Sequence, residues 1–356
     1  MKDIVFELSA KPVGTFTERL DELHGQFTNK LAELRVGQDG LMWTRLFLSD
    51  AANQLPEVLQ HPFYKEVLSQ AAFSYIEQSP LSGSKVALMA GITPDEVQRE
   101  GTPDRFILKH NGKRFLFHSV RFTAEEAVAM DAKQQTKEAF ARHIAWLTAE
   151  GLTLKDHCVR TWLFVRDIDR NYHDVVVGRN EVFALYGLTP QTHFIASTGI
   201  AGNGANGNEV LCADFWSVDD PDMEVHYLQA LDYLNPTHQY GVAFERGTAF
   251  VSAGVKRLLI SGTASIDKEG RCLYEGDVLR QAERLFCNIE HLLADGGATL
   301  ADVAFLYVYL RDLSEYAAVS RFLDERFPGL PRQVVLAPVC RPQWLIEAEC
   351  IAYQSV

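Results

Sequence analysis

The sequence has few of the features that mark nucleic-acid-binding, secreted or membrane proteins. Its 356 residues include 34 Lys and Arg against 47 Asp and Glu, a formal net charge of −13, and no basic run. Because neutralising phosphates requires clustered Lys and Arg, we expect no nucleic-acid partner. The N-terminal MKDIVFELSA lacks a signal-peptide pattern, and no apolar stretch reaches membrane-spanning length. We therefore expect a cytoplasmic protein without a membrane partner.

Motifs for metals and nucleotide cofactors are also missing. The six cysteines form no CxxC pair and the eleven histidines no HxxxH or HxH pair, so we expect reduced, buried thiols and no metal. GNGANG at 202–207 matches GxGxxG, but the alternating NEVLCADFWSV follows it instead of a helix. The motif is therefore interpreted as a hairpin loop.

A divergent internal repeat occupies the rest of the chain. Stretches starting at Gly151 and Gly297 both read Gly-x-Thr-Leu-x-Asp, then a strand, Arg-Asp and a helix. Each follows a long amphipathic pattern, over 124–150 and 277–295, that predicts a helix. Paired strand patterns lie further upstream, at 74–92 and 240–266. The two copies thus extend over about 74–218 and 240–356.

This order predicts an α+β fold of two domains, each a mostly antiparallel sheet with two helices on one face. The boundaries are 1–220, which includes an N-terminal extension, and 221–356. The predicted strand VRTWLFV turns Arg160 and two aromatic residues to the second face, and its counterpart AFLYVYL turns three aromatic residues there. Such a face is too apolar for water, so we expect it to pack between domains. Arg160 then needs an anion, either a ligand or a glutamate.

The segment CRPQWLIEAECIA, from Cys340 to Ala352, is predicted as a strand. Alternation puts Glu347 and Glu349 on one of its faces. This face is either solvated or lines a pocket in which a carboxyl group transfers protons. Arg332 opens an earlier strand, and a hairpin between the two strands would place it beside Glu347, as a ligand anchor or as a plain ion-pair partner. The small residues Ala253 and Gly254 would leave room for a ligand.

The C-terminal copy resembles the RidA/YjgF fold, which belongs to the chorismate mutase-like architectures. The similarity is in ISGTASI (260–266), GATLADV (297–303), VYLRDLSEY (308–316), LPRQVV (330–335) and IEAECIA (346–352). It implies that Arg332 binds a carboxylate while Glu347 works beside it.

Two such units, with RTWLFVRDI at 160–168 and CRPQWLIEAE at 340–349, resemble the chorismatase family. That resemblance implies a cofactor-independent enzyme that removes pyruvate from chorismate. It also implies that a cysteine at the position of Cys340 is associated with hydroxybenzoate formation. The expected product is chiefly 3-hydroxybenzoate, with 4-hydroxybenzoate as a second possible product. In the family, the residue at the position of Ala253 varies with the type of product.

Chorismate carries an enol ether, and protonation of its methylene carbon gives an oxocarbenium ion. Burial and a neighbouring Glu349 would raise the pKa of Glu347 so that it can donate this proton. Arg160 and Arg332 would bind the carboxylates of the substrate, and Glu349, Ala253 and Gly254 would also contact it. Alternatives are hydrolysis to a dihydroxycyclohexadiene carboxylate, a RidA-type imine deaminase, and a non-enzymatic ligand-binding protein. We expect a monomer or a small homo-oligomer.

Overall fold

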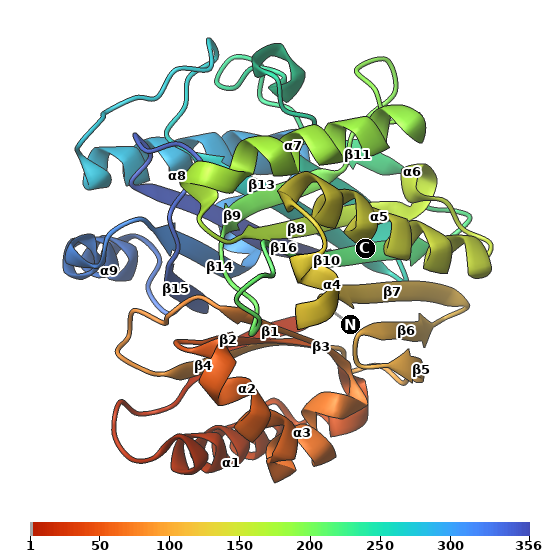
Figure 1. Cartoon of the computed structure of the whole chain (residues 1–356), viewed down its shortest axis with the longest axis vertical. Helices are drawn as coiled ribbons and strands as arrows, with labels where there is room; N and C mark the ends of the chain where they lie inside the picture. The colour runs from red at the N-terminus through yellow and green to blue at the C-terminus, as the bar shows by residue number, and fades with distance from the viewer. Residues whose placement is uncertain (1–2) are drawn as a thin grey trace.

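The structure, a computed structural model, describes residues 3–356 and contains three β-sheets with their helices on the outer sides (Figure 1). The first sheet has the order β1-β4-β2-β3. Its strands are β1 (Ile4–Ser9), β2 (Leu41–Leu48), β3 (Ala72–Glu77) and β4 (Val86–Ile92), and its helices are α1 (Phe16–Leu34), α2 (Ala51–Gln60) and α3 (Pro62–Glu66).

The second sheet has the order β5-β6-β7-β10-β8-β9. Its strands are β5 (Gln98–Thr102), β6 (Arg105–His110), β7 (Lys113–Val120), β8 (Cys158–Val165), β9 (Ala196–Ala201) and β10 (Leu211–Asp219). Four helices accompany it: α4 (Ala124–Val128), α5 (Ala132–Ala149), α6 (Leu154–His157) and α7 (Ile168–Leu185).

The third sheet has the order β11-β12-β13-β16-β14-β15. Its strands are β11 (Val225–Tyr227), β12 (Gly247–Ser252), β13 (Val255–Ala264), β14 (Val303–Leu310), β15 (Arg332–Leu336) and β16 (Ile346–Ser355). Helix α8 (Val278–Asp295) buries Leu285, Ile289 and Leu292 at helical spacing, as predicted. Helix α9 (Tyr316–Arg326) precedes β15.

One four-strand pattern occurs in all three sheets. The orders β1-β4-β2-β3, β7-β10-β8-β9 and β13-β16-β14-β15 are equivalent. Each contains a single parallel pair, namely β2 with β3, β8 with β9, and β14 with β15. The expected repeat is therefore present, and the N-terminal segment contains a third version of it.

The placement of strands 74–92 in the first repeat was wrong. β3 pairs with β2, and β4 pairs between β1 and β2, all within the first sheet. Alternation identifies a strand but not its partner, which explains the error. In place of the boundaries 1–220 and 221–356, we propose three units over 3–92, 98–219 and 225–355.

The helix predicted over 124–150 is interrupted. Helix α4 ends at Val128, and Asp131 caps a new helix, α5, by accepting a hydrogen bond from the backbone N–H of Gln134. Among residues 3–356, no helix is long and apolar enough to cross a membrane.

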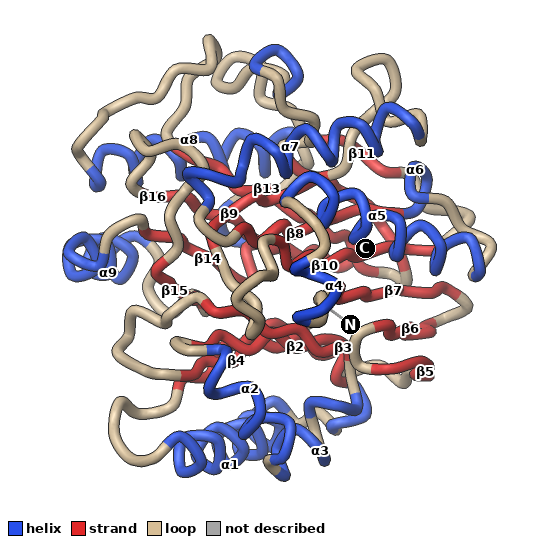
Figure 2. The backbone as a smooth tube through the Cα atoms, viewed as in Figure 1, coloured by secondary structure: helices blue, strands red, loops and turns tan. Residues whose placement is uncertain are grey.

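The sheets face one another through the aromatic face predicted from the sequence, and helices cover their other faces (Figure 2). Phe164, Tyr307 and Tyr309 are fully buried. Tyr307 stacks edge-on against Phe47 of the first sheet at 5.1 Å between ring centroids, and its hydroxyl donates to Gln78. The prediction of inter-unit packing is confirmed, and the packing also includes the first sheet.

Candidate active site

Glu347 and Glu349 lie on the same face of β16, as alternation predicts. β16 runs antiparallel to both of its neighbours, so that Glu349 lies opposite Tyr307 and Glu347 lies between Tyr309 and Ala264. Each glutamate is only 5% exposed. The strand face that carries both glutamates is therefore buried against the second sheet. It is not exposed to solvent, which was one of the two possibilities from the sequence.

The carboxylate of Glu349 is bound entirely by the second sheet. Arg160 Nη2 donates to its Oε2 at 2.6 Å, and Trp162 Nε1 donates to its Oε1 at 2.6 Å. The hydroxyl of Thr198 also donates to Oε2. Both oxygens of this buried carboxylate therefore have hydrogen-bond donors, as buried polar groups need.

This pairing corrects the prediction that Arg160 and Glu349 contact a substrate. Arg160 is 1% exposed and forms an ion pair with Glu349. Of the two anions considered for Arg160, a ligand or a glutamate, the structure shows the glutamate. Neither residue lines the cavity that Glu347 faces. Their contribution is to join two sheets and to fix a negative charge near Glu347.

Glu347 differs from its neighbour in having no side-chain partner. Within residues 3–356 it makes no hydrogen bond or ion pair of its own. Burial, and next the charge of Glu349, raise the pKa of Glu347 to about 8, against the opposing effects of Arg160 and Arg246. At neutral pH Glu347 is therefore a carboxylic acid that can donate a proton.

Glu347 opens into a cavity between the second and third sheets, with about 540 Å³ of empty space that includes its mouth. The polar lining comprises Tyr172, Arg179, Ser197, Arg246, Cys340, Arg341 and Glu347, and the rest is Gly199, Val242, Phe244, Gly262, Ala264, Ile266 and Trp344. The three arginines concentrate positive charge in this cavity, in an otherwise acidic protein.

Helix α7 and the segment before β12 supply the residues that sequence reasoning missed. Tyr172 and Arg179 are seven residues apart on α7 and thus lie on one face of it. Arg179 is 1% exposed and Arg246 is 6% exposed, and Arg246 Nη2 donates to the carbonyl of Asn235 at 3.1 Å. A buried arginine within the valine-rich run of α7 was the signal available in the sequence.

Two glycines make room for the reactive groups. A Cβ at Gly262 would lie 2.2 Å from Oε1 of Glu347. A Cβ at Gly199 would lie 2.8 Å from the ring of Tyr172. Any larger residue at either position would displace the cavity lining.

Cys340 lies in the cavity, but not on a strand. β16 begins only at Ile346, and the Arg-Pro step after Cys340 lies in a turn. Burial, and next the nearby Glu347, raise the pKa of the Cys340 thiol to about 12 despite a hydrogen bond with Tyr172. The thiol is therefore neutral and lies within the same cavity as the acid.

The structure does not bring Arg332 to Glu347. β14 separates β15 from β16, so the assumed hairpin was wrong. Arg332 instead pairs with Asp324. Its charge acts on Glu7 of the first sheet.

Ala253 and Gly254 are likewise outside the cavity. They form the two-residue turn between β12 and β13, with φ of 51° and 76°. Positive φ at both positions is what a tight hairpin turn requires. The turn lies at the far end of β13 from Ala264, the partner of Glu347. The small residues there therefore serve the turn.

In residues 3–356, no group of three or more His, Cys, Asp or Glu side chains is arranged to hold a metal ion. The reactive side chains that line the cavity are a carboxylic acid, a thiol, a phenol and guanidinium groups.

Comparisons with known proteins give a family and a fold. The family model described as Endoribonuclease L-PSP matches residues 242–354. The 3-aminoacrylate deaminase RutC of Acinetobacter baylyi is 30% identical over 96 residues, 26% of this chain and 76% of the relative. A RutC family protein of Pyrococcus abyssi is 34% identical over 100 residues, 28% of this chain and 79% of the relative.

The crystal structure of a chorismatase matches with a TM-score of 0.66 and covers 99% of both chains, at 18% identity. The α+β fold with RidA-like units, expected from the sequence, is thereby confirmed.

We predict that Arg160→Ala lowers the free energy of unfolding by about 3–5 kcal/mol, because it leaves the buried Glu349 without its cation. Urea unfolding measures the loss. Arg326→Ala is the matched control, because its ion pair with Glu290 is over a third exposed and should change stability by about 1 kcal/mol or less. Equal, small losses in both variants would show that the Arg160–Glu349 pair does not hold the sheets together.

Proposed function

This chain belongs to the RutC family, and from that premise, together with its chorismatase-like fold, we propose that it is an enzyme that releases pyruvate from chorismate. The observation that carries the proposal is Glu347, a buried carboxylic acid facing a cavity with three arginines. Chorismate is a dicarboxylate with an acid-labile enol ether, so it needs both features.

In the proposed reaction, Glu347 donates its proton to the methylene carbon of the enolpyruvyl group, which gives an oxocarbenium ion and the Glu347 carboxylate. Attack by water on the cation gives a hemiketal, which collapses with cleavage of the bond between the former enol carbon and the ether oxygen, so pyruvate leaves and the ring keeps both oxygens. Attack by the ring hydroxyl is instead followed by cleavage of one ring C–O bond, so that pyruvate leaves with that oxygen, and a ring proton passes to the Glu347 carboxylate as the ring becomes aromatic. Attack by water yields a dihydroxycyclohexadiene carboxylate, whereas loss of pyruvate with aromatisation yields a hydroxybenzoate. Neither route needs a cofactor.

Arg179 and Arg246 replace Arg160 and Arg332 as the residues that bind the substrate carboxylates. Both line the cavity, and they come from different units, so they hold a ligand across the junction. Guanidinium groups pair with carboxylates through two parallel hydrogen bonds, which orients the ligand as well as binding it. The methylene carbon must then lie within reach of Glu347.

Cys340 and Tyr172 favour hydroxybenzoate formation, chiefly of 3-hydroxybenzoate, in this proposal. Both line the cavity with Glu347 and have raised pKa values, so they stay neutral and do not activate water, while the Glu347 carboxylate formed in the first step takes the ring proton. Hydrolysis, the alternative, requires a water in the cavity.

An imine deaminase of the RutC type is the competing reaction on this fold. It uses an arginine of the Pro-Arg strand beside the glutamate, whereas here Arg332 is separated from Glu347 by β14. Incubation with chorismate and detection of pyruvate decides between them. Ammonia release from an imine without pyruvate release from chorismate would establish the deaminase, and binding of chorismate without turnover would establish a binding protein.

We predict that Glu347→Gln retains chorismate binding but releases pyruvate about 10²–10⁴ times more slowly, because the amide cannot donate the proton. A coupled pyruvate assay measures the rate. Glu7→Gln is the matched control: Glu7 also has a raised pKa in a largely buried site, but lies in the first sheet. If Glu347→Gln keeps more than about a tenth of the wild-type rate, the donor is another group.

We also predict the pH dependence of kcat/KM. The reactive form of Glu347 is the acid, which is present below its pKa of about 8 and is lost above it. Activity should therefore be level from neutral pH up to that pKa and then fall by about tenfold per pH unit. A decline that begins near pH 4 or 5 would mean that Glu347 is ionised in the free enzyme.

Replacing Cys340 by Ala should move the product from hydroxybenzoate toward the dihydroxycyclohexadiene carboxylate while pyruvate release continues. The reason is that the smaller side chain admits water where the thiol stood. Chromatography of the products measures the ratio, with Cys287→Ala on α8 as the control. An unchanged ratio in Cys340→Ala would exclude the thiol from product control.

A further inference from the structure

The reactive groups of the Glu347 cavity are almost closed to solvent. Glu347 is 5% exposed, Arg179 is 1% exposed and Arg246 is 6% exposed. Such small exposed fractions mean that even water hardly touches these three side chains. A ring that carries two carboxylates is much larger than water, so part of the cavity wall must move before such a ligand can reach them.

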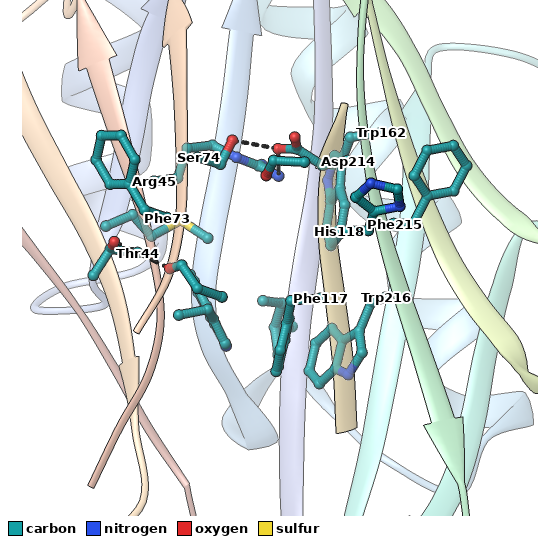
Figure 3. A pocket seen from close by; sticks show the side chains of 15 residues that line it. Thr44, Arg45, Phe73, Ser74, Phe117, His118, Trp162, Asp214, Phe215 and Trp216 are labelled. Atoms are coloured by element: carbon teal, nitrogen blue, oxygen red, sulfur yellow. Dashed lines mark hydrogen bonds and ion pairs between the residues drawn. The ribbon is translucent and has the colours of Figure 1, made fainter. Parts of the chain in front are cut away.

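The regular elements of the wall are poorly suited to this movement. Helix α7 and the strands β9, β13 and β16 supply much of the lining, and displacing any of them would break the hydrogen bonds of a helix or a sheet. A second cavity, between the first and second sheets, is lined by strand residues alone (Figure 3). The Glu347 cavity differs, because two loops, one before β12 and one before β16, supply most of its remaining wall.

The loop before β16 is fixed in place by a buried glutamine of α8. Nε2 of Gln281 donates to the carbonyl of Gln343 at 2.9 Å, and its Oε1 accepts from the backbone N–H of Leu345 at 2.9 Å. The indole N–H of Trp344 donates to the carbonyl of Ser265 at 3.1 Å. Gln281 is fully buried, and buried hydrogen bonds are costly to break, so this loop stays with the third sheet.

The loop before β12 is held more lightly. Its stretch from Thr237 to Phe244, which we call the Thr237–Phe244 loop, brings Val242 and Phe244 to the cavity wall and lies at the top of the view in Figure 1. The hydroxyl of Thr237 donates to the carbonyl of Phe244 at 2.5 Å and accepts from its backbone N–H at 3.4 Å. Because its ends are joined in this way, the loop can move as a unit.

The tip of the Thr237–Phe244 loop is latched to α7 by Asn180. Nδ2 of Asn180 donates to the carbonyl of Gly241 at 3.3 Å, at a solvent-exposed position. Oδ1 of the same Asn180 accepts from Nη2 of Arg179 at 3.4 Å, so the latch also contacts an arginine proposed to bind the substrate. Ala243 packs against the second unit with a single methyl group. An exposed hydrogen bond and one methyl group stabilise the closed position only weakly.

We propose that the Thr237–Phe244 loop is the lid of the Glu347 cavity and that Asn180 is its latch: the lid opens to admit the ligand and, when latched, excludes water. The exclusion of water rests on the proposed function, in which water competes with the ring hydroxyl for the oxocarbenium ion. A closed lid therefore favours the hydroxybenzoate, and an open lid favours the dihydroxycyclohexadiene carboxylate.

Alkylation of Cys340 by N-ethylmaleimide tests the lid without any turnover. Cys340 lines the cavity, so its labelling rate, followed by mass spectrometry of its peptide, reports how often the lid is open. We expect labelling about three- to tenfold faster in Asn180→Ala than in the wild type at the same pH, because loss of the latch shifts the lid toward the open position. Cys287 on α8 does not line the cavity and should react at an unchanged rate, as the internal reference.

Asn171→Ala is the matched control, because Asn171 is also on α7 and its Nδ2 also donates to a backbone carbonyl, that of Arg166, at 2.7 Å. It should leave the labelling of Cys340 unchanged. Thr237→Val removes the hydroxyl that joins the ends of the loop but keeps the shape of the side chain, and it should also speed labelling. The lid is excluded if neither Asn180→Ala nor Thr237→Val labels Cys340 faster than the wild type does, or if Asn171→Ala speeds labelling as much.

With chorismate as the substrate, Asn180→Ala should raise the share of the dihydroxycyclohexadiene carboxylate among the products, relative to Asn171→Ala. Chromatography measures this share. Faster labelling without a change of product would overturn the exclusion of water by the lid. If the wild type releases no pyruvate from chorismate, the proposed function and the water exclusion that rests on it fail together, while the labelling rates still decide whether the loop is a lid.

Discussion

The ion pair between Arg160 and Glu349 is the contact on which the Glu347 site depends. It crosses from β8 to β16 and is buried on both sides. Together with Trp162 and Thr198, Arg160 supplies hydrogen-bond donors from the second sheet to both oxygens of Glu349. Within residues 3–356 no group forms a hydrogen bond or ion pair with Glu347, which is 5% exposed and lies two residues from Glu349. The burial of Glu347 and the neighbouring charge of Glu349 together raise the pKa of Glu347.

The repeat of one strand pattern in three sheets explains where cavities form. The sheets pack through their inner faces, so each junction is lined by the central strand of one unit and the edge strand of another. Equivalent positions on the central strands are Glu347, Cys212 and Ala87. A single residue changes the chemistry of a junction, so one scaffold has an acid at one junction and a thiol at the equivalent position of another.

The sequence predicted the features that depend on neighbouring residues of one strand. It did not predict those that depend on which strands or units pack together. Alternation along one strand placed Glu347 and Glu349 together, and the aromatic face around Arg160 correctly indicated a junction between units. Strand partners are not encoded in alternation, so 74–92 was assigned to the wrong sheet and Arg332 to the wrong neighbour. Packing between units brings three further residues to the cavity, namely Tyr172, Arg179 and Arg246. Local sequence patterns do not predict such packing. Ala253 was expected to leave room for a ligand because it is small, but it lies in a turn that requires its positive φ.

The central claim is that Glu347 holds a proton at neutral pH, and the direct measurement is its titration by ¹³C NMR. Glutamate labelled at the side-chain carboxyl carbon gives the signals, and the spectrum of Glu347→Gln identifies the one that belongs to Glu347. The account predicts a midpoint near 8 for that signal. A midpoint near 4.5, the ordinary value for a glutamate, would contradict it, because the residue would then be ionised throughout the pH range in which the enzyme is proposed to work.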